Sequence, residues 1–208
     1  MEEDLSFPRV KKFFLFIFIS LLFTSKSFSE NFKLEKIVSL NEPWGSSFVN
    51  KDEIIITEKS GKIKIINILN GNATEIEHNL NFLEYGQGGL LDILHKDNFI
   101  YISYTENRSN WKTSTSIAKA KLDKKKLLFK NIFQANPPID SGYHFGSRLA
   151  IKDNYLFASA GERGKGMIAQ DASKHPGSII RIHLDGSIPK ENPKFKDEPK
   201  WLPEIYQI

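Results

Sequence analysis

One unit recurs three times in this 208-residue chain: a strand-like run, a turn that begins with Lys-Asp, and a second strand-like run. The copies follow one another at intervals of roughly 45 to 55 residues, a spacing typical of four-stranded β-propeller blades. Chance reuse of a common turn is the alternative, but three copies in the same strand context favour a structural repeat. The copies are Gly45–Phe48, Lys51-Asp52-Glu53 and Ile54–Ile56; Gly89–Leu91, Lys96-Asp97-Asn98 and Phe99–Ile102; and Gly146–Leu149, Lys152-Asp153-Asn154 and Tyr155–Phe157.

Short apolar runs fill the chain beyond its N-terminal segment, and no long helical period appears among them. Ile54–Thr57 and Lys62–Ile68 form one predicted hairpin, and Phe99–Tyr104 is expected to pair with Ser114–Leu122. We therefore predict an all-β protein, a partial β-propeller of about three blades. Pro203–Tyr206 is expected to open a fourth blade. Since blades bury their faces only against neighbouring blades, we interpret the chain as the N-terminal half of a larger propeller.

Composition narrows the classes of function. Hydrophobic residues make up 40% of the chain and charged residues 26%, as in globular proteins. The formal net charge of +4 comes from scattered lysines rather than from one basic block, so no nucleic-acid partner is expected. The chain has no cysteine, which excludes disulfides and thiolate metal sites.

The N-terminus has the layout of a secretory signal. The basic pair Lys11-Lys12 precedes an apolar run over Phe13–Phe23, and Ser27-Phe28-Ser29 offers small residues for cleavage. An uncleaved membrane anchor is the less favoured alternative, because the apolar run is short for a bilayer span. We predict a signal peptide over residues 1–29 and a propeller domain over residues 30–208. The mature protein would then be periplasmic or secreted, with no stable membrane span.

Loops at the starts of the innermost strands of successive blades converge on one end of a propeller's central channel. Here these loops would bring Gln87 and His144 to one pocket. A histidine at a loop-to-strand junction is both anchored and open to a ligand; the alternative is a histidine that merely satisfies a turn. The three loops are Pro43-Trp44-Gly45, Gly86–Gly89 and Gly142–Arg148.

A further glycine-rich loop, Gly161–Gly166, carries Arg163 and Lys165. Cations on such a loop suit an anionic cofactor, and a solvated turn is the open alternative. The Gly86–Gly89 stretch lacks the strand–loop–helix context of a nucleotide-phosphate loop. The sequence therefore argues against NAD or ATP binding.

Several short motifs occur in one order along the chain. They are Pro43-Trp44-Gly45; Thr57-Glu58 with Gly61; Gly86–Asp92 with His95; His144–Arg148; Gly161–Gly164; Ala169-Gln170-Asp171; and Gly177 through Arg181 to Asp185-Gly186. In this order they resemble the soluble quinoprotein glucose/sorbosone dehydrogenase family, and within it the aldose sugar dehydrogenases. The resemblance extends from about Leu34 to the C-terminus.

The resemblance implies a six-bladed propeller that binds pyrroloquinoline quinone (PQQ) with calcium. Such a protein oxidises the anomeric hydroxyl of an aldose sugar and passes electrons to an external acceptor. His144 matches the family's general base, which takes the hydroxyl proton while hydride leaves for the quinone. Gln87 matches a glutamine that lines the site. Arg148 matches the arginine that follows the base, and a structural role under the loop is the alternative to a ligand contact. Arg163 or Lys165 matches the place of a cationic cofactor contact.

Two positions depart from the family pattern. The glucose-type enzymes have an acidic residue directly before the base, whereas this chain has Tyr143, which leaves both the sugar and the orienting partner of the imidazole open. Glu162 replaces the more usual aspartate after Gly161. In the family the calcium ligands and further cationic contacts come largely from later blades. No metal ligand is therefore assigned, and the chain alone is expected to be inactive. A non-catalytic propeller that binds a carbohydrate or a protein partner is the alternative.

Overall fold

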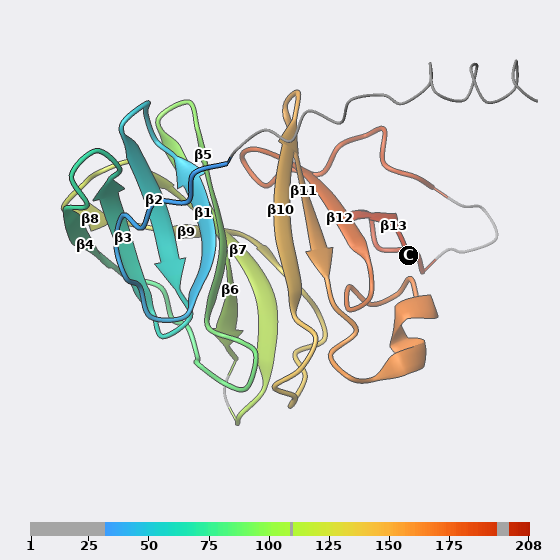
Figure 1. Cartoon of the computed structure of the whole chain (residues 1–208). Coiled ribbons are helices and arrows are strands. Elements are labelled where there is room, and N and C mark those ends of the chain that lie inside the picture. Colours follow the sequence, from blue (N-terminus) through green and yellow to red (C-terminus); the bar gives the residue numbers. More distant parts are fainter. Residues whose placement is uncertain (1–31, 109, 195–199) are drawn as a thin grey trace, which may run out of the picture. The chain divides into compact units, whose positions relative to one another are not determined.

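The computed structural model describes residues 32–108, 110–194 and 200–208, and these residues form almost only β-structure (Figure 1). The signal peptide predicted over residues 1–29 lies outside the described residues. All the strands fall within the compact unit Lys36–Ile208. Within the described part, no helix has both the length and the apolar character needed to cross a lipid bilayer.

The strands form three sheets that follow one another along the chain, except that β8 returns to the first sheet (Figure 1). The first sheet has the order β1-β2-β3-β4-β8, with β1 at Pro43–Phe48, β2 at Glu53–Glu58, β3 at Lys62–Asn67, β4 at Ala73–His78 and β8 at Lys126–Leu127. The second has the order β5-β6-β7-β9, with β5 at Leu90–Lys96, β6 at Phe99–Asn107, β7 at Thr113–Lys121 and β9 at Lys130–Gln134. The third has the order β10-β11-β12-β13, with β10 at Gly146–Lys152, β11 at Tyr155–Ala160, β12 at Ile179–His183 and β13 at Ile205–Gln207. A short 3₁₀ helix, η1, spans Gly166–Gln170 between β11 and β12.

The sheets confirm the predicted all-β partial propeller. Strands β2 and β3 pair as the expected hairpin, with Ile55 opposite Ile65. Strands β6 and β7 pair with Ile102 opposite Ala118. Neighbouring strands are antiparallel except β4 and β8, which run parallel because the chain leaves the second sheet briefly to extend the first.

The expected start of a fourth blade is instead the last strand of the third sheet. Ile205 lies opposite Ile180 of β12, and its side chain is fully buried. The strand-like pattern of Pro203–Tyr206 predicts a strand but not the sheet that it joins, and the burial of Ile205 against β12 decides its place. The three sheets are therefore complete in four strands or more, and the described residues contain no part of a fourth.

Two apolar clusters fill the spaces between neighbouring sheets. One joins the first and second sheets and includes Ile55 and Ile93, neither of which is exposed. The other joins the second and third sheets and includes Tyr101 and Leu156. The second sheet thus buries both faces, which explains why its strands read as nearly continuous apolar or small residues rather than as a strict alternation.

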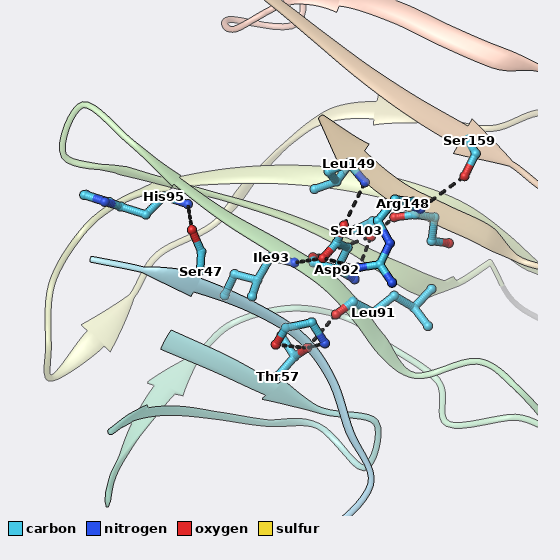
Figure 2. A network of polar contacts seen from close by, with 12 residues as sticks. Ser47, Thr57, Leu91, Asp92, Ile93, His95, Ser103, Arg148, Leu149 and Ser159 are labelled. Atoms are coloured by element: carbon cyan, nitrogen blue, oxygen red, sulfur yellow. Dashed lines mark hydrogen bonds and ion pairs between the residues drawn. The ribbon is translucent and has the colours of Figure 1, made fainter. Parts of the chain in front are cut away.

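A side-chain hydroxyl on the second strand of a sheet ties that sheet to the next (Figure 2). Thr57 in β2 accepts a hydrogen bond from the Gly45 N–H of its own sheet at 3.0 Å. It donates to the Leu91 carbonyl of β5, in the next sheet, at 2.5 Å. All three residues are buried, so the hydroxyl satisfies polar backbone groups that water cannot reach.

Ser103 in β6 repeats this arrangement between the second and third sheets. Its hydroxyl accepts from the Asp92 N–H at 2.9 Å and donates to the Ser147 carbonyl of β10 at 2.6 Å. Because the same hydroxyl contacts two innermost strands at once, it fixes how far one sheet is shifted against the next. We call this arrangement the hydroxyl link.

Removing one hydroxyl link should lower stability. We expect Ser103→Ala to reduce the free energy of unfolding by about 1–3 kcal/mol, since it leaves a buried N–H and a buried carbonyl without that partner. Urea denaturation, monitored by circular dichroism, measures this change in the free energy of unfolding. Ser46→Ala, at an exposed position of β1, is the matched control and should change stability by less than about 0.5 kcal/mol. Equal stability of the two variants would contradict the role of the link.

Candidate functional site

The Gln87 loop and the His144 loop lie directly against each other. The Gln87 N–H donates to the Gly142 carbonyl at 2.7 Å, and the His144 N–H donates to the Gln87 side-chain oxygen at 2.9 Å. Gly86 has φ +60°, and a Cβ there would lie 2.4 Å from the Gly142 oxygen, so only glycine allows this approach. The structure therefore brings together the two residues that the sequence predicted at one pocket.

The backbone at His144 is held in an unusual conformation. Its φ of 49° lies in the left-handed region, which few residues other than glycine adopt. The His144 carbonyl accepts from the Arg163 N–H at 3.3 Å. A Cβ at Gly161 would lie 1.9 Å from that same carbonyl oxygen, so glycine is required there as well. The loop after β11 thus clamps the backbone of His144, while its side chain remains 55% exposed.

Glu162 provides the orienting partner of the imidazole that the sequence left open. Its carboxylate Oε1 lies 2.5 Å from His144 Nδ1 and also accepts the Gly164 N–H at 3.1 Å. The hydrogen bond with His144 is the main reason that the pKa of Glu162 lies below its usual value. A carboxylate at Nδ1 favours the tautomer with the proton on Nδ1, which leaves Nε2 as a proton acceptor. Among the described residues Nε2 has no hydrogen-bond partner.

Sequence reasoning noted Glu162 only as a departure from a family pattern and gave it no role. His144 and Glu162 are 18 residues apart and lie next to different strands, so no local spacing pattern joins them. The signal that could have found the pair was the repeat itself. Both residues lie at the same ends of antiparallel neighbours, one just before β10 and the other just after β11, which the predicted hairpin already implied.

The two cations of the Gly161–Gly166 loop lie in different surroundings. The Arg163 side chain is buried beneath the His144 loop, with its guanidinium carbon 3.6 Å from the centre of the Phe145 ring, and burial lowers its pKa to about 10. Lys165 is exposed. The Arg163 guanidinium donates to the Tyr143, Ser141 and Thr113 carbonyls and to the Thr113 hydroxyl. Of these two predicted cofactor contacts, only Lys165 presents an exposed charge.

Arg148 is exposed and anchored at the same time (Figure 2). Its Nη1 lies 3.1 Å from Asp92 Oδ1, and its guanidinium carbon lies 4.7 Å from the centre of the Trp44 ring system. Asp92 is buried and also accepts the Leu149 N–H at 2.8 Å. These contacts join β1, β5 and β10, the innermost strands, so Arg148 presents a fixed cation on the surface that these strands line.

The donor set of this region suits an anionic organic group better than a metal ion. Arg148 and Lys165 are exposed cations, and the Gln87 amide nitrogen has no partner among the described residues. Within residues 32–108, 110–194 and 200–208, no group of three or more His, Cys, Asp or Glu side chains could hold a metal ion. The exposed groups described here therefore carry positive charge, and the described residues offer no cluster of carboxylate and imidazole ligands for a cation.

Known proteins resemble the chain over most of its length. A family model described as glucose / sorbosone dehydrogenase matches residues 40–208. Aldose sugar dehydrogenase YliI of Escherichia coli (strain K12) is 30% identical over 168 residues, which cover 76% of this chain and 45% of that protein. Quinoprotein glucose dehydrogenase B of Acinetobacter calcoaceticus is 27% identical over 208 residues, which cover 82% of this chain and 43% of that protein.

A solved structure supports the same relationship. The apo form of the soluble aldose sugar dehydrogenase of Escherichia coli superposes on this chain with a TM-score of 0.74 at 29% identity. The superposition covers 80% of this chain and 51% of that chain. This chain thus spans about half the length of the relatives that it matches.

The buried Arg163 should matter for stability and its exposed neighbour should not. We expect Arg163→Lys to lower the free energy of unfolding by about 2–3 kcal/mol, because an ammonium cannot reproduce the guanidinium's planar set of donors. Lys165→Ala is the control and should stay within about 0.5 kcal/mol. Urea denaturation of both variants measures the difference, and a Lys165→Ala variant as unstable as Arg163→Lys would contradict the assignment.

The His144–Glu162 contact gives a pH dependence of defined sign. The folded-state pKa of Glu162 lies below its usual value of 4.5, so its contribution to stability is complete above that value and is lost as the pH falls through the lowered pKa. Glu162→Gln lacks this contribution. We therefore expect the free energy of unfolding of the wild type to exceed that of the variant by at most about 1 kcal/mol near neutral pH. This difference should close below pH 4.5. A gap that widens on acidification, in denaturation measured at several pH values, would contradict this.

Proposed function

The chain belongs to the glucose/sorbosone dehydrogenase family, and on that premise we propose that it carries the proton-accepting part of a PQQ-dependent sugar oxidation site. The observation that carries the proposal is the His144–Glu162 pair, in which the carboxylate binds Nδ1 at 2.5 Å and leaves Nε2 open. The name of the quinoprotein relative supports a quinone cofactor. The expected export signal supports a periplasmic or secreted location.

In the proposed reaction His144 acts as the general base. Its exposed Nε2 takes the proton of the anomeric hydroxyl, and Glu162 stabilises the imidazolium that forms. PQQ, when bound, supplies an electrophilic carbon that accepts the hydride. The clamp on the His144 backbone keeps the ring in place while the proton moves, so little reorganisation is needed at the reacting atom.

Three exposed groups of this chain would hold the cofactor. PQQ is a planar tricarboxylate, and Arg148 and Lys165 offer positive charge while the Gln87 amide nitrogen offers a neutral donor. Arg163 supports the His144 loop from beneath, so we assign it a positioning role rather than a cofactor contact. Calcium receives no ligand set from the described residues, so no step depends on it here.

Tyr143 bears on which sugar the proposed site would accept. It stands where glucose-type enzymes have an acidic residue, its side chain is exposed, and its ring lies 6.3 Å from the His144 ring. The aromatic ring offers a flat apolar surface to the C–H face of a sugar, and its neutral hydroxyl lacks the negative charge that an acidic residue would bring. We therefore infer an aldose substrate, and not glucose in particular.

A chimaera tests the proposal, because this chain spans only part of its relatives. Residues 40–208 would replace the matching segment of Escherichia coli aldose sugar dehydrogenase, and the product would be supplied with PQQ and calcium. We expect it to reduce a dye in the presence of aldoses. His144→Ala should lower the rate by about a hundredfold or more, since a positioned base contributes about that much.

His95→Ala is the matched control for that variant, because His95 lies in β5 and has no contact with the His144 loop among the described hydrogen bonds. Its rate should stay within about twofold of the parent chimaera. Undiminished dye reduction by the His144→Ala variant would contradict the assignment of His144 as the general base. A folded chimaera that binds aldoses without reducing the dye would favour the non-catalytic binding propeller instead.

A further inference from the structure

The turn between β6 and β7 holds a large aromatic side chain in an uncommon backbone conformation. Trp111 has a φ of 61° and Asn110 a φ of 49°, both in the left-handed region that bulky residues rarely adopt. Trp111 is also 69% exposed, and neither apolar cluster of the described residues contains it. Core packing therefore does not account for a tryptophan at this position, and such a backbone outlier is a reason to look for a ligand.

Two sets of hydrogen bonds fix this turn against the segment that carries Tyr143. Thr113, two residues after Trp111, exchanges backbone hydrogen bonds with Ile139 at 3.0 and 2.9 Å. The buried Arg163 guanidinium binds the Thr113 carbonyl at 3.2 Å and the Tyr143 carbonyl at 3.0 Å. The turn therefore lies directly beside the segment that leads into β10 (Figure 1).

Three exposed side chains belong to this junction. Trp111 stands on the turn, and Tyr143, which is 62% exposed, stands beside His144 with its ring 6.3 Å from the imidazole. Asp140 is exposed as well and directly follows Ile139, which pairs with the start of β7. We call Trp111, Asp140 and Tyr143 the outer rim. It lies on the connection between the second and third sheets, both of which the structure describes.

The outer rim has the chemistry of a sugar-binding surface. A sugar ring presents C–H groups on its faces and hydroxyls around its edge, so an aromatic face combined with hydrogen-bonding groups binds it well. Trp111 and Tyr143 supply aromatic area, and the Asp140 carboxylate can accept hydroxyl donors. Asn110 and Lys112, which flank Trp111, are exposed and polar, whereas the core of a protein–protein interface is apolar. The rim therefore suits a small amphipathic ligand better than a protein partner.

The arrangement of the rim indicates more than one sugar ring. Tyr143 directly precedes His144, so a ring that reacts at the imidazole is expected to contact Tyr143. Trp111 belongs to the connection of another sheet and adjoins Tyr143 through the Thr113 and Arg163 contacts. A second ring, linked to the reacting one, is therefore expected to reach Trp111.

We propose that the outer rim binds the second ring of an oligosaccharide whose reducing end lies at His144. Trp111 stacks on the C–H face of that second ring, and Asp140 accepts hydrogen bonds from its hydroxyls. Trp111 is thereby a specificity-determining residue that favours oligosaccharides over single sugars. The inference rests on the proposed function for the position of the reacting ring, but binding at the rim can be measured without any oxidation.

Nuclear magnetic resonance of the 208-residue chain tests this binding directly. The chain has three tryptophans, so labelled indole groups give three N–H signals, and the Trp111→Tyr variant identifies the signal of Trp111. We expect cellotetraose, xylotetraose or maltotetraose to shift this signal and to leave that of Trp201, which packs on the second apolar cluster, in place. If none of the three tetrasaccharides moves the Trp111 signal, the proposal is overturned. An equal shift with glucose would assign Trp111 to the reacting ring and would overturn it as well.

Titration calorimetry of variants measures what the indole contributes. Trp111→Ala should weaken binding of the tetrasaccharide by about tenfold because the stacking is lost, while Trp111→Tyr should stay within about threefold of the parent. Phe48→Ala is the matched control, since Phe48 is 59% exposed but ends β1, away from the loops that lead into the innermost strands, and it should leave binding unchanged. Circular dichroism checks that each variant is folded. Equal affinities of Trp111→Ala and the parent would contradict the assignment.

The chimaera with Escherichia coli aldose sugar dehydrogenase separates this inference from the proposed function. There Trp111→Ala should raise KM for the tetrasaccharide about tenfold and leave kcat, and both constants for glucose, within about twofold. A merely structural role of Trp111 would change the glucose constants too, and that result would contradict the specificity role. A chimaera that oxidises no sugar, beside a chain that binds the tetrasaccharide through Trp111, would contradict the proposed function alone.

Discussion

Burial of one sheet against the next is the constraint on which the rest of this structure depends. A four-stranded sheet with apolar side chains on both faces cannot satisfy them alone, so it needs a neighbour on each side. Ile55, Tyr101 and Leu156 are buried only because adjacent sheets cover them. Apolar packing by itself tolerates sliding. The hydroxyls of Thr57 and Ser103 remove that freedom, because each must reach two backbone groups on two different innermost strands.

The candidate site follows from this constraint. Because the innermost strands are fixed against one another, the loops that lead into them meet at reproducible distances. Gln87 and His144 are 57 residues apart in the chain, yet their loops exchange hydrogen bonds at 2.7 and 2.9 Å. Glu162 reaches the imidazole from the far end of the next strand, and Arg163 supports the loop from beneath. The exposed His144 imidazole therefore stands on a buried support, as the proposed general base would require in order to hold one orientation while a proton moves.

Particular residues show how much of the structure could be predicted from the sequence. Strand and turn patterns led to the right hairpins, since alternation and turn chemistry are local properties. The same local reasoning misplaced Pro203–Tyr206, because a strand-like segment does not state which sheet it joins, and burial of Ile205 decided that. Arg163 and Lys165 looked equivalent on one glycine-rich loop, but only the fold shows that the first points inward. Glu162 escaped notice as a partner of His144 because its contact crosses between strands.

The sequence alone determined that this protein is a chain of β-sheet repeats with a histidine, a glutamine and cations on glycine-bearing loops, since composition, periodicity and motif order are written along the chain. The tertiary structure alone decided which of those groups touch and which of them are buried. The bond from His144 to Glu162 joins residues 18 positions apart and forms where β10 and β11 of one sheet lie side by side. The bond from Ser103 to Ser147 joins residues 44 positions apart, and its buried geometry arises only when two neighbouring sheets exclude water from the strands between them.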